Sequence, residues 1–358
     1  MKASARKLKV DVEAIALPKG RRVGTLGHAK VEAYLTTRLR EIGCKPYRGR
    51  SFRLPYSVRG KQFINLAGKI PGRNPKLPPL LVGAHYDSVI DAPCADDNAA
   101  AVAIALAVGK QVMSGKALDR DLVVAIFDAE EPPYFQTPAM GSNRFYKDQM
   151  DARGVHAAIV MDLVGHDVSL PLGSIAGWIP GVRSIVNRFR KLAGFDMKLP
   201  LLHNLVFITG AESHPSLAGI LDSCEHPDAL KLVPTLNHYV GDMSDHGAFR
   251  KNGVPYLFLS CGRWAHYHKE TDTPDRLNYT KMAAISDLTE SLLVALDEEE
   301  LPHGSRERVC DTLELEATYL RRSLGPLYPL LLKLAGVKEV LSREDMDACV
   351  EKLLSAGA

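Results

Sequence analysis

Histidine and carboxylate side chains stand at the end of the most continuous apolar segment of this chain. The apolar run at residues 80–84 is followed at once by His85 and Asp87. Two adjacent carboxylates, Asp96 and Asp97, come a short way on and precede an alanine-rich stretch. Imidazole and carboxylate ligands together suit zinc or a similar divalent cation. The residue types and their spacing therefore suggest a metal site.

Three further apolar segments also end in acidic or histidine side chains. The segments lie at 121–131, 155–165 and 254–262, and the side chains that end or follow them are Glu130, Glu131, Asp162, His266 and His268. A charged carboxylate beside a core is costly unless it meets a cation. Ligands of open α/β sheets gather at the carboxyl ends of the strands. We therefore expect these side chains to converge on one edge of a sheet.

The elements that must position these residues alternate along the chain. Strands are predicted at 63–70, 80–84, 121–131, 155–165, 204–210 and 254–262, and helices at 27–43, 98–113, 181–193 and 280–296. The alternation indicates an α/β fold with a mixed, mostly parallel central sheet and helices on both faces. Residues 1–299 are predicted to form the main domain. Residues 300–358 are predicted to be a helical extension that packs on it or mediates homo-oligomer contacts.

Composition excludes several functional classes. A formal net charge of +3 over 358 residues is too small to indicate nucleic-acid or membrane binding. No apolar run approaches the ~18 residues of a membrane-spanning helix, and the N-terminus does not resemble a secretory signal. Six cysteines lie scattered without a CxxC pair, which argues against a disulfide framework and a thiolate zinc site. We expect a cytoplasmic protein.

Six short segments give the chain a resemblance to the M28 metallopeptidases, zinc aminopeptidases whose clan includes the glutaminyl cyclases. The segments occur in family order and are GAHYDS at 83–88, ADDN at 95–98, FDAEE at 127–131, MDLVG at 161–165, SDHGAF at 244–249 and YHKETDTPD at 267–275. The resemblance covers roughly residues 25–297. It implies a zinc exopeptidase-like fold and a peptide substrate.

The resemblance also implies a role for each matching residue. Two zinc ions would share Asp97, with His85 and Asp162 completing one site and Glu131 and His268 the other. The histidine of the family's YH-x-x-x-D pattern falls on His268, which is preferred to His266 for that reason.

The remaining matches concern catalysis and substrate. Glu130 resembles the general base, and Asp87 resembles the carboxylate that orients His85. Four residues are candidates for contacts with substrate or with the tetrahedral oxyanion: Asp245, His246, Tyr239 and Trp264. Asp96 is interpreted as a supporting or turn residue, and four further histidines are expected to be solvated in loops: His166, His214, His226 and His238.

Three functions are compatible with these residues. The first is an aminopeptidase with two zinc ions, and the ADDNAAAVA segment favours it. The second is a glutaminyl cyclase with a single zinc ion, because the loop at 132–140 is longer than is usual in the aminopeptidases. In the aminopeptidase interpretation, Tyr134 and Phe135 of this loop would line a pocket for a large apolar first residue. The third is a non-catalytic binding protein, which would be expected to have lost Glu130 or a ligand.

Overall fold

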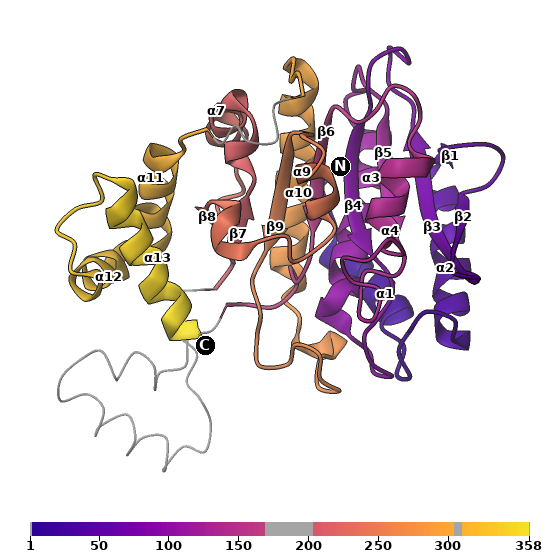
Figure 1. Ribbon diagram of the computed structural model, residues 1–358, viewed down its shortest axis with the longest axis horizontal. Helices are drawn as coiled ribbons and strands as arrows, with labels where there is room; N and C mark the ends of the chain where they lie inside the picture. Colours follow the sequence, from indigo (N-terminus) through magenta and orange to yellow (C-terminus); the bar gives the residue numbers. More distant parts are fainter. Residues whose placement is uncertain (1, 169–202, 304–309, 358) are drawn as a thin grey trace.

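A nine-stranded mixed sheet runs through the computed structural model, which describes residues 2–168, 203–303 and 310–357 (Figure 1). The strands follow the order β1-β3-β5-β4-β6-β9-β7-β8, and β2 pairs with β3. Their bounds are β1 (Lys45–Pro46), β2 (Arg53–Val58), β3 (Lys61–Ile70), β4 (Leu80–His85), β5 (Leu122–Phe127), β6 (Ala157–Met161), β7 (Leu205–Thr209), β8 (Lys231–Pro234) and β9 (Tyr256–Ser260).

Parallel pairing defines the centre of the sheet. β5, β4, β6 and β9 are parallel neighbours, and β7 pairs with β8 in the same sense. The other pairs, which involve β1, β2 and β3 on one side and β7 with β9 on the other, are antiparallel. The predicted mixed α/β sheet is therefore confirmed. Its parallel strands place their carboxyl ends along one edge, where the predicted ligands lie.

Both faces of the central strands are buried, as their continuous apolar sequences predicted. Side chains alternate between the faces of a strand. In β4, Leu80 and Val82 belong to the larger hydrophobic cluster, whereas Leu81 belongs to a second cluster with Phe145 and Phe249. The sheet is thus a middle layer between two sets of helices.

The helices divide between the two faces. Residues of α1, α2, α3 and α10 pack in the larger cluster, while η2 and α9 contribute to the cluster on the opposite face. The longer helices are α1 (Ala5–Ile15), α2 (Leu26–Ile42), α3 (Ala101–Ser114), α7 (Pro215–Ser223), α10 (Tyr279–Glu298), α11 (Leu313–Leu324), α12 (Tyr328–Ala335) and α13 (Arg343–Gly357). The shorter ones are η1 (Ala95–Ala100), α4 (Gly141–Arg144), η2 (Phe145–Gln149), η4 (Ala211–Ser213), α8 (Asn237–Val240), α9 (His246–Arg250), η5 (Pro274–Arg276) and η6 (Gly325–Leu327).

Local sequence accounts for the bounds of α2, the helix predicted at 27–43. The Thr25 side chain caps its start by accepting a hydrogen bond from the backbone N–H of His28 at 3.2 Å. Gly43 ends it in the left-handed region at φ 99°, which glycine adopts without a Cβ clash. The helix predicted at 181–193 lies outside the described residues.

The C-terminal helices cover the β8 end of the sheet (Figure 1). Leu320 and Leu324 of α11 share a hydrophobic cluster with Leu205 of β7 and Val233 of β8. The Ser323 hydroxyl donates to the carbonyl of Leu232 at 2.6 Å. The extension therefore packs on the sheet, and its role in homo-oligomer contacts stays a prediction.

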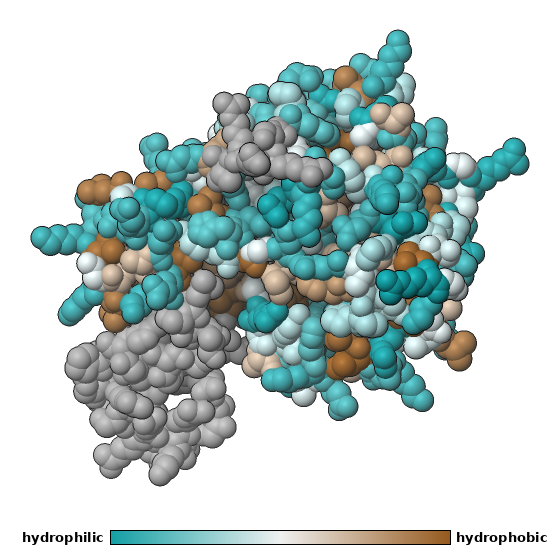
Figure 2. Space-filling model, viewed as in Figure 1, coloured by the Kyte–Doolittle hydropathy of each residue, from teal (hydrophilic) through white to brown (hydrophobic). Residues whose placement is uncertain are grey.

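Hydrophilic residues dominate the face seen in Figure 2, and hydrophobic residues there form small separate groups. Within the described ranges, the exposed large hydrophobic residues are far apart in sequence: Val10, Leu26, Met243 and Leu341. No helix among the described residues has both the length and the apolar character needed to cross a membrane.

Candidate metal centre

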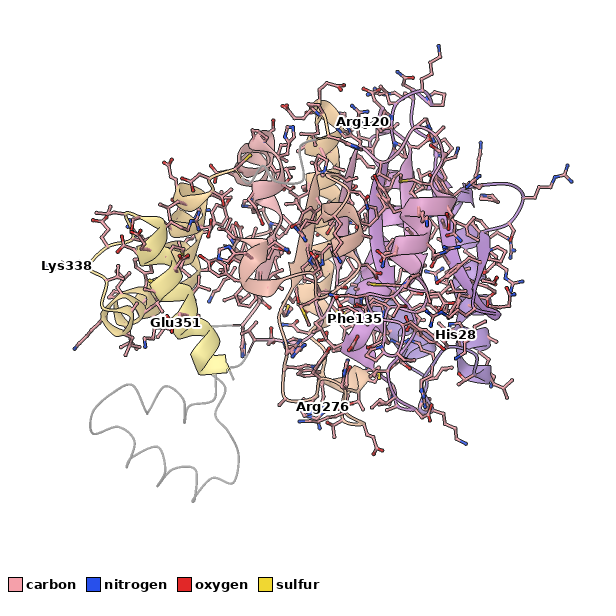
Figure 3. The ribbon with its side chains drawn as sticks, viewed as in Figure 1. His28, Arg120, Phe135, Arg276, Lys338 and Glu351 are labelled. Atoms are coloured by element: carbon pink, nitrogen blue, oxygen red, sulfur yellow. The ribbon has the colours of Figure 1, made fainter. Side chains whose placement is uncertain are left out.

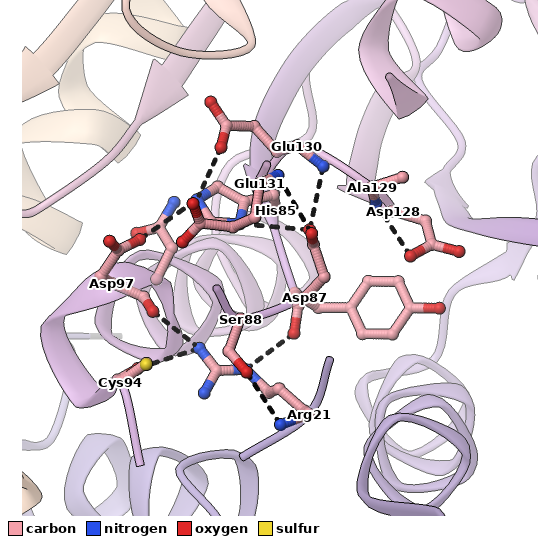
Figure 4. Close-up of polar contacts among 12 residues, drawn as sticks. Arg21, His85, Asp87, Ser88, Cys94, Asp97, Asp128, Ala129, Glu130 and Glu131 are labelled. Atoms are coloured by element: carbon pink, nitrogen blue, oxygen red, sulfur yellow. Dashed lines mark hydrogen bonds and ion pairs between the residues drawn. The ribbon is translucent and has the colours of Figure 1, made fainter. Parts of the chain in front are cut away.

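The predicted ligands come together at the carboxyl edge of the parallel strands. Figure 4 labels three of them, His85, Asp97 and Glu131. His85 is the last residue of β4, Glu131 follows β5, and Asp162 follows β6 directly. His268 lies in the loop after β9, and Asp97 lies in η1, the first helical segment after β4. The parallel centre of the sheet thus brings five segments of the chain to one place.

These residues form two ligand groups that share one carboxylate. His85, Asp97 and Asp162 make one group, and Asp97, Glu131 and His268 make the other, with the ligand atoms of each group within 4.8 Å of one another. Asp97 Oδ1 lies 3.5 Å from His85 Nε2, and its Oδ2 lies 3.1 Å from His268 Nε2. The two oxygens of Asp97 therefore face different groups, as a bridging carboxylate must.

The remaining distances complete each group. Asp162 Oδ2 lies 3.8 Å from His85 Nε2, and Glu131 Oε2 lies 3.4 Å from His268 Nε2. Buried polar atoms normally have hydrogen-bond partners, because leaving them unpaired is costly. Several of the buried atoms that could bind a metal have no hydrogen-bond partner here, namely His85 Nε2, Glu131 Oε1, Asp162 Oδ1 and His268 Nε2. A cation bound by imidazole nitrogens and carboxylate oxygens would satisfy them, and this donor set fits zinc.

A non-helical turn presents Asp97 to both groups. The helix predicted at 98–113 is in fact preceded by η1, inside which Asp97 (φ −109°, ψ 88°) and Asn98 (φ −130°, ψ 32°) depart from helical geometry. The Asn98 side chain donates to the carbonyl of Met161 at 3.0 Å. The Asp272 carboxylate accepts the backbone N–H groups of Asp96 and Asp97 at 2.9 and 3.2 Å. These contacts fix the turn to β6 and to the loop that carries His268.

Asp96 belongs to neither ligand group and holds the loop after Asp162 instead. Its Oδ1 accepts the backbone N–H of Gly165 at 2.6 Å, and its Oδ2 lies 2.6 Å from His166 Nδ1. The imidazole of His166 stacks on Trp264 with ring centroids 4.7 Å apart. Trp264 therefore packs against a residue pair that supports the candidate metal centre.

The expectation of solvated loop histidines is wrong for two of the four. His166 is 1% exposed and is held by Asp96, as described above. His214 is also buried, and its Nδ1 caps α7 by accepting the backbone N–H of Ser216 at 3.2 Å. Tertiary packing buries both, whereas His226 is half-buried and His238 is exposed.

Asp87 connects His85 to the turn that carries the two glutamates. Its Oδ1 lies 3.4 Å from His85 Nδ1. The same carboxylate accepts the backbone N–H groups of Glu130 and Glu131, both at 3.0 Å (Figure 4). One buried side chain therefore orients an imidazole and fixes the backbone beside it.

Glu130 lies next to the ligand groups without belonging to either. It is 4% exposed, and its Oε2 lies 3.7 Å from His85 Nε2. Burial raises the pKa of Glu130 well above its usual range, and the negative charges of Asp162 and Asp245 add to this effect, while His85 opposes it. A carboxylate with a raised pKa is suited to accept a proton near neutral pH.

A second buried pair, which sequence reasoning missed, supports the glutamate turn. His28 Nε2 of α2 lies 2.8 Å from Asp128 Oδ1, and the His28 ring stacks on Tyr86. Asp128 in turn accepts the backbone N–H of Ala129 at 2.8 Å. Burial alone would lower the pKa of His28, but the hydrogen bond and charge of Asp128 outweigh it and raise that pKa above 6.5. The partners are 100 residues apart, so no local pattern reveals the pair.

Asp245 interacts with the charged groups of the candidate metal centre. The side chains of His246 and Tyr239 form hydrogen bonds with residues outside that centre. Asp245 is fully buried, and burial raises its pKa to about 7; the charges of Asp162 and Asp87 add to the rise, whereas His85 and the Ser142 hydroxyl oppose it. The imidazole Nε2 of His246 lies 3.1 Å from Asn237 Oδ1, and the ring stacks on Phe258. The Tyr239 hydroxyl donates to Asp347 of α13. The Nδ1 atom of His246 is buried without a hydrogen-bond partner, and the oxyanion roles expected of His246 and Tyr239 stay predictions.

The loop at 132–140 packs on β3 rather than standing free. The ring of Tyr134 meets Phe63 edge-on with centroids 5.0 Å apart, and its expected role in lining a substrate pocket stays a prediction. Phe135 is half-buried (Figure 3). Gln136 donates from its side chain to the carbonyl of Asp242 at 2.8 Å. This contact ties the loop to the segment that leads to Asp245.

Two sequence comparisons identify relatives of the chain. The model of "Peptidase family M28" matches residues 65–178 and 182–293, which is more than half of the chain. The uncharacterized protein YfbL of Escherichia coli strain K12 is 26% identical over 238 residues, which cover 60% of this chain and 66% of that protein. The match thus spans slightly less than two thirds of that relative's length.

Solved structures share the fold. Glutaminyl cyclase from Porphyromonas gingivalis superposes with a TM-score of 0.53 at 17% identity, covering 81% of this chain and 97% of that one. A leucine aminopeptidase precursor from Bacteroides thetaiotaomicron superposes with a TM-score of 0.58 at 15% identity, covering 84% of this chain and 99% of that one. Both likenesses concern the fold and extend over nearly the whole of those structures.

Proposed function

The chain belongs to peptidase family M28, and from that premise we propose that it is a zinc-dependent aminopeptidase acting on peptides with a free N-terminus. Family membership itself supports a metallopeptidase-like hydrolase. The observation that carries the finer proposal is the pair of complete ligand groups that share Asp97. Every position needed for two metal ions and a separate base is filled, which argues against a binding protein that has lost its catalytic residues.

Each ligand group would hold one zinc ion. His85, Asp97 and Asp162 would bind the first, and Asp97, Glu131 and His268 the second. When bound, a pair of zinc ions lowers the pKa of a shared water and polarises the scissile carbonyl group. Asp87 would keep the His85 imidazole in one tautomer and orientation, which is the usual effect of a carboxylate behind a ligating histidine.

Glu130 would carry the proton. Its carboxylate would take a proton from the attacking water and pass it to the leaving amine, which a residue outside the ligand groups can do. Asp87 fixes the backbone of Glu130, so the side chain starts from a defined position. The acidic side chains of Glu130 and Asp245 lie at the same edge, where they would accept hydrogen bonds from the α-ammonium group of a substrate.

Glutaminyl cyclisation is the second candidate, because the fold matches a glutaminyl cyclase over nearly the whole of that protein. The two reactions are separated by offering the zinc-loaded chain a leucine nitroanilide, its N-acetylated form and a peptide with N-terminal glutamine. We expect hydrolysis of the free nitroanilide with two zinc ions per chain. Acetylation should reduce the rate at least ~100-fold, or ~2.7 kcal/mol of transition-state binding.

Two results would change the assignment. Cyclisation of the glutamine peptide with one zinc ion per chain, and no hydrolysis, would replace the aminopeptidase proposal by the cyclase. Similar rates for the free and acetylated nitroanilides would show that the enzyme does not recognise a free N-terminus.

A further inference from the structure

A fully buried arginine lies beneath the metal centre and comes from outside the region that the family model matches. Arg21 is in the segment between α1 and α2, whereas the match begins at residue 65. Its side chain is 0% exposed. It follows Gly20, where an added Cβ would collide with the carbonyl of Ile90. The segment is therefore pressed closely against the loop that follows β4.

The guanidinium group of Arg21 donates to four backbone carbonyls of this loop and of the turn that follows it. Figure 4 labels Arg21 and two of the acceptor residues, Cys94 and Asp97. The acceptors are Tyr86 at 2.7 Å, Pro93 at 2.6 Å, Cys94 at 2.9 Å and Asp97 at 3.1 Å. The backbone N–H of Arg21 adds a fifth contact, to the Ser88 hydroxyl at 2.9 Å. One residue thus contacts both ends of the loop and its middle.

The conformation of this loop sets the distance between two proposed metal ligands, His85 and Asp97. His85 precedes it and Asp97 follows it, and residues 86–94 contain no helix or strand. Without a regular hydrogen-bond ladder, the loop depends on other donors to fix its shape. The planar guanidinium offers its donors in a rigid fork, so it sets the relative positions of the carbonyls that it binds.

The positive charge of Arg21 is stabilised by backbone carbonyls and not by an ion pair in the described part of the chain. Among the ion pairs of the described residues, none involves Arg21, although a buried charge is costly without compensation. The nearby carboxylate cluster supplies negative potential, and the four carbonyls supply the hydrogen bonds. The arginine is therefore placed where a lysine could supply the charge but not the planar set of contacts.

We propose that Arg21 is a positioning residue that sets the separation of His85 and Asp97 and thereby the zinc affinity of the centre. The proposal rests on the proposed function for the identity of the metal alone. Arg21→Lys keeps the charge and removes the fork. Residues that orient metal ligands typically contribute 10- to 100-fold to metal affinity. We expect a weakening of zinc binding of ~10- to 100-fold in R21K.

A matched control is provided by Arg120, a second buried arginine at the opposite end of the strands (Figure 3). It precedes β5, whereas the metal centre follows β5. It binds the carbonyl of Pro78 at 3.5 Å and Glu300 Oε1 at 3.0 Å. R120K therefore removes a buried guanidinium without touching the loop between His85 and Asp97.

The experiment measures zinc affinity by chelator competition, the visible absorption spectrum of the Co2+-loaded chain, and the thermal midpoint. We expect weaker zinc binding and an altered cobalt spectrum in R21K, with both unchanged in R120K. Unchanged affinity and spectrum in R21K would overturn the proposal. So would equal losses in the two variants, which would show a general effect of removing a buried arginine.

A second variant covers the case in which R21K does not fold. Arg21→Gln keeps a shorter planar donor group and undergoes the same comparison. Failure of both variants to fold with zinc present, while R120K folds, would overturn the proposal in favour of a general folding role. Zinc binding is measured without substrate. A wild-type chain that binds zinc but hydrolyses nothing would therefore refute the proposed function, while the zinc affinities of R21K and R120K could still be compared. A wild-type chain that binds no metal would overturn both.

Discussion

Replacing Glu130 by glutamine should remove most of the turnover and leave the zinc content unchanged. Glu130 is 4% exposed and lies 3.7 Å from His85 Nε2, yet it belongs to neither ligand group. Its backbone contact with Asp87 does not involve the side chain and is kept in the variant. Glutamine has nearly the same shape as glutamate, so the substitution removes basicity and changes little else.

The expected size of the effect follows from the role of the base. A positioned general base contributes ~10²- to 10⁴-fold to the rate. At 1.36 kcal/mol for each factor of ten, the loss is about 2.7–5.4 kcal/mol of transition-state stabilisation. Because the surroundings of Glu130 are buried, bulk water has little access to replace the lost base. We therefore expect a loss in the upper part of this range.

The assay compares kcat/KM for a leucine nitroanilide with the zinc content of each purified variant. Glu131→Gln is the matched control, because the neighbouring glutamate belongs to the second ligand group. E131Q should lose zinc as well as activity, whereas E130Q should lose activity alone. Residual activity of E130Q within tenfold of the wild type, or a loss of zinc in E130Q, would refute the assignment of the base.

Three further predictions concern the supporting residues. Asp97→Ala should lose more zinc than Asp96→Ala, because only Asp97 belongs to both ligand groups. Equal loss of zinc in the two variants would refute the assignment of Asp97 as the shared ligand. The raised pKa of His28 means that its contribution to stability is complete below pH 6.5 and is lost as the pH rises through the folded-state pKa. His28→Gln should therefore flatten the pH dependence of the urea unfolding free energy above about pH 6.5. The carboxylates that act on this histidine are Asp128, Asp87 and Glu32. Removing residues 310–358 should lower the thermal midpoint of unfolding and cause aggregation, because it would expose Val233 and the β8 end of the sheet, which α11 covers. An unchanged thermal midpoint would contradict this prediction.

The central strands were predictable because each is buried on both faces and reads as an unbroken apolar run. The outer strands were harder. β2 spans Arg53–Val58 with exposed and buried residues in alternation, yet no strand was predicted there. Pro55 in its middle argues against a central strand, and proline is tolerated at such a position on an edge. Pairing direction also depends on tertiary contacts, so the antiparallel pairs of β3 and β7 had no local signal.

The residues of the two candidate ligand groups were predictable as a cluster because each one stands at a strand end or within a short motif. Their supports were not. Asp272 lies within a quoted motif, but its contact with the turn at Asp97 spans 175 residues. The contact between Asp96 and His166 spans 70 residues, and sequence alone makes the histidine look like a solvated loop residue. A buried polar side chain can be recognised only through its partner, and these partners are distant in sequence.

The distribution of charge connects the fold to the proposed chemistry. The chain carries a formal net charge of only +3, yet buried carboxylates gather at one edge of its sheet. They are Asp87, Asp97, Glu130, Glu131, Asp162 and Asp245. Removing carboxylates from water is unfavourable unless a cation compensates them. His85 and His268 offset only part of this charge, and Arg21 supports the loop from below. In the proposed function, zinc bound at the two ligand groups would supply this balance, so the cations that the proposed chemistry needs would also compensate the buried acids.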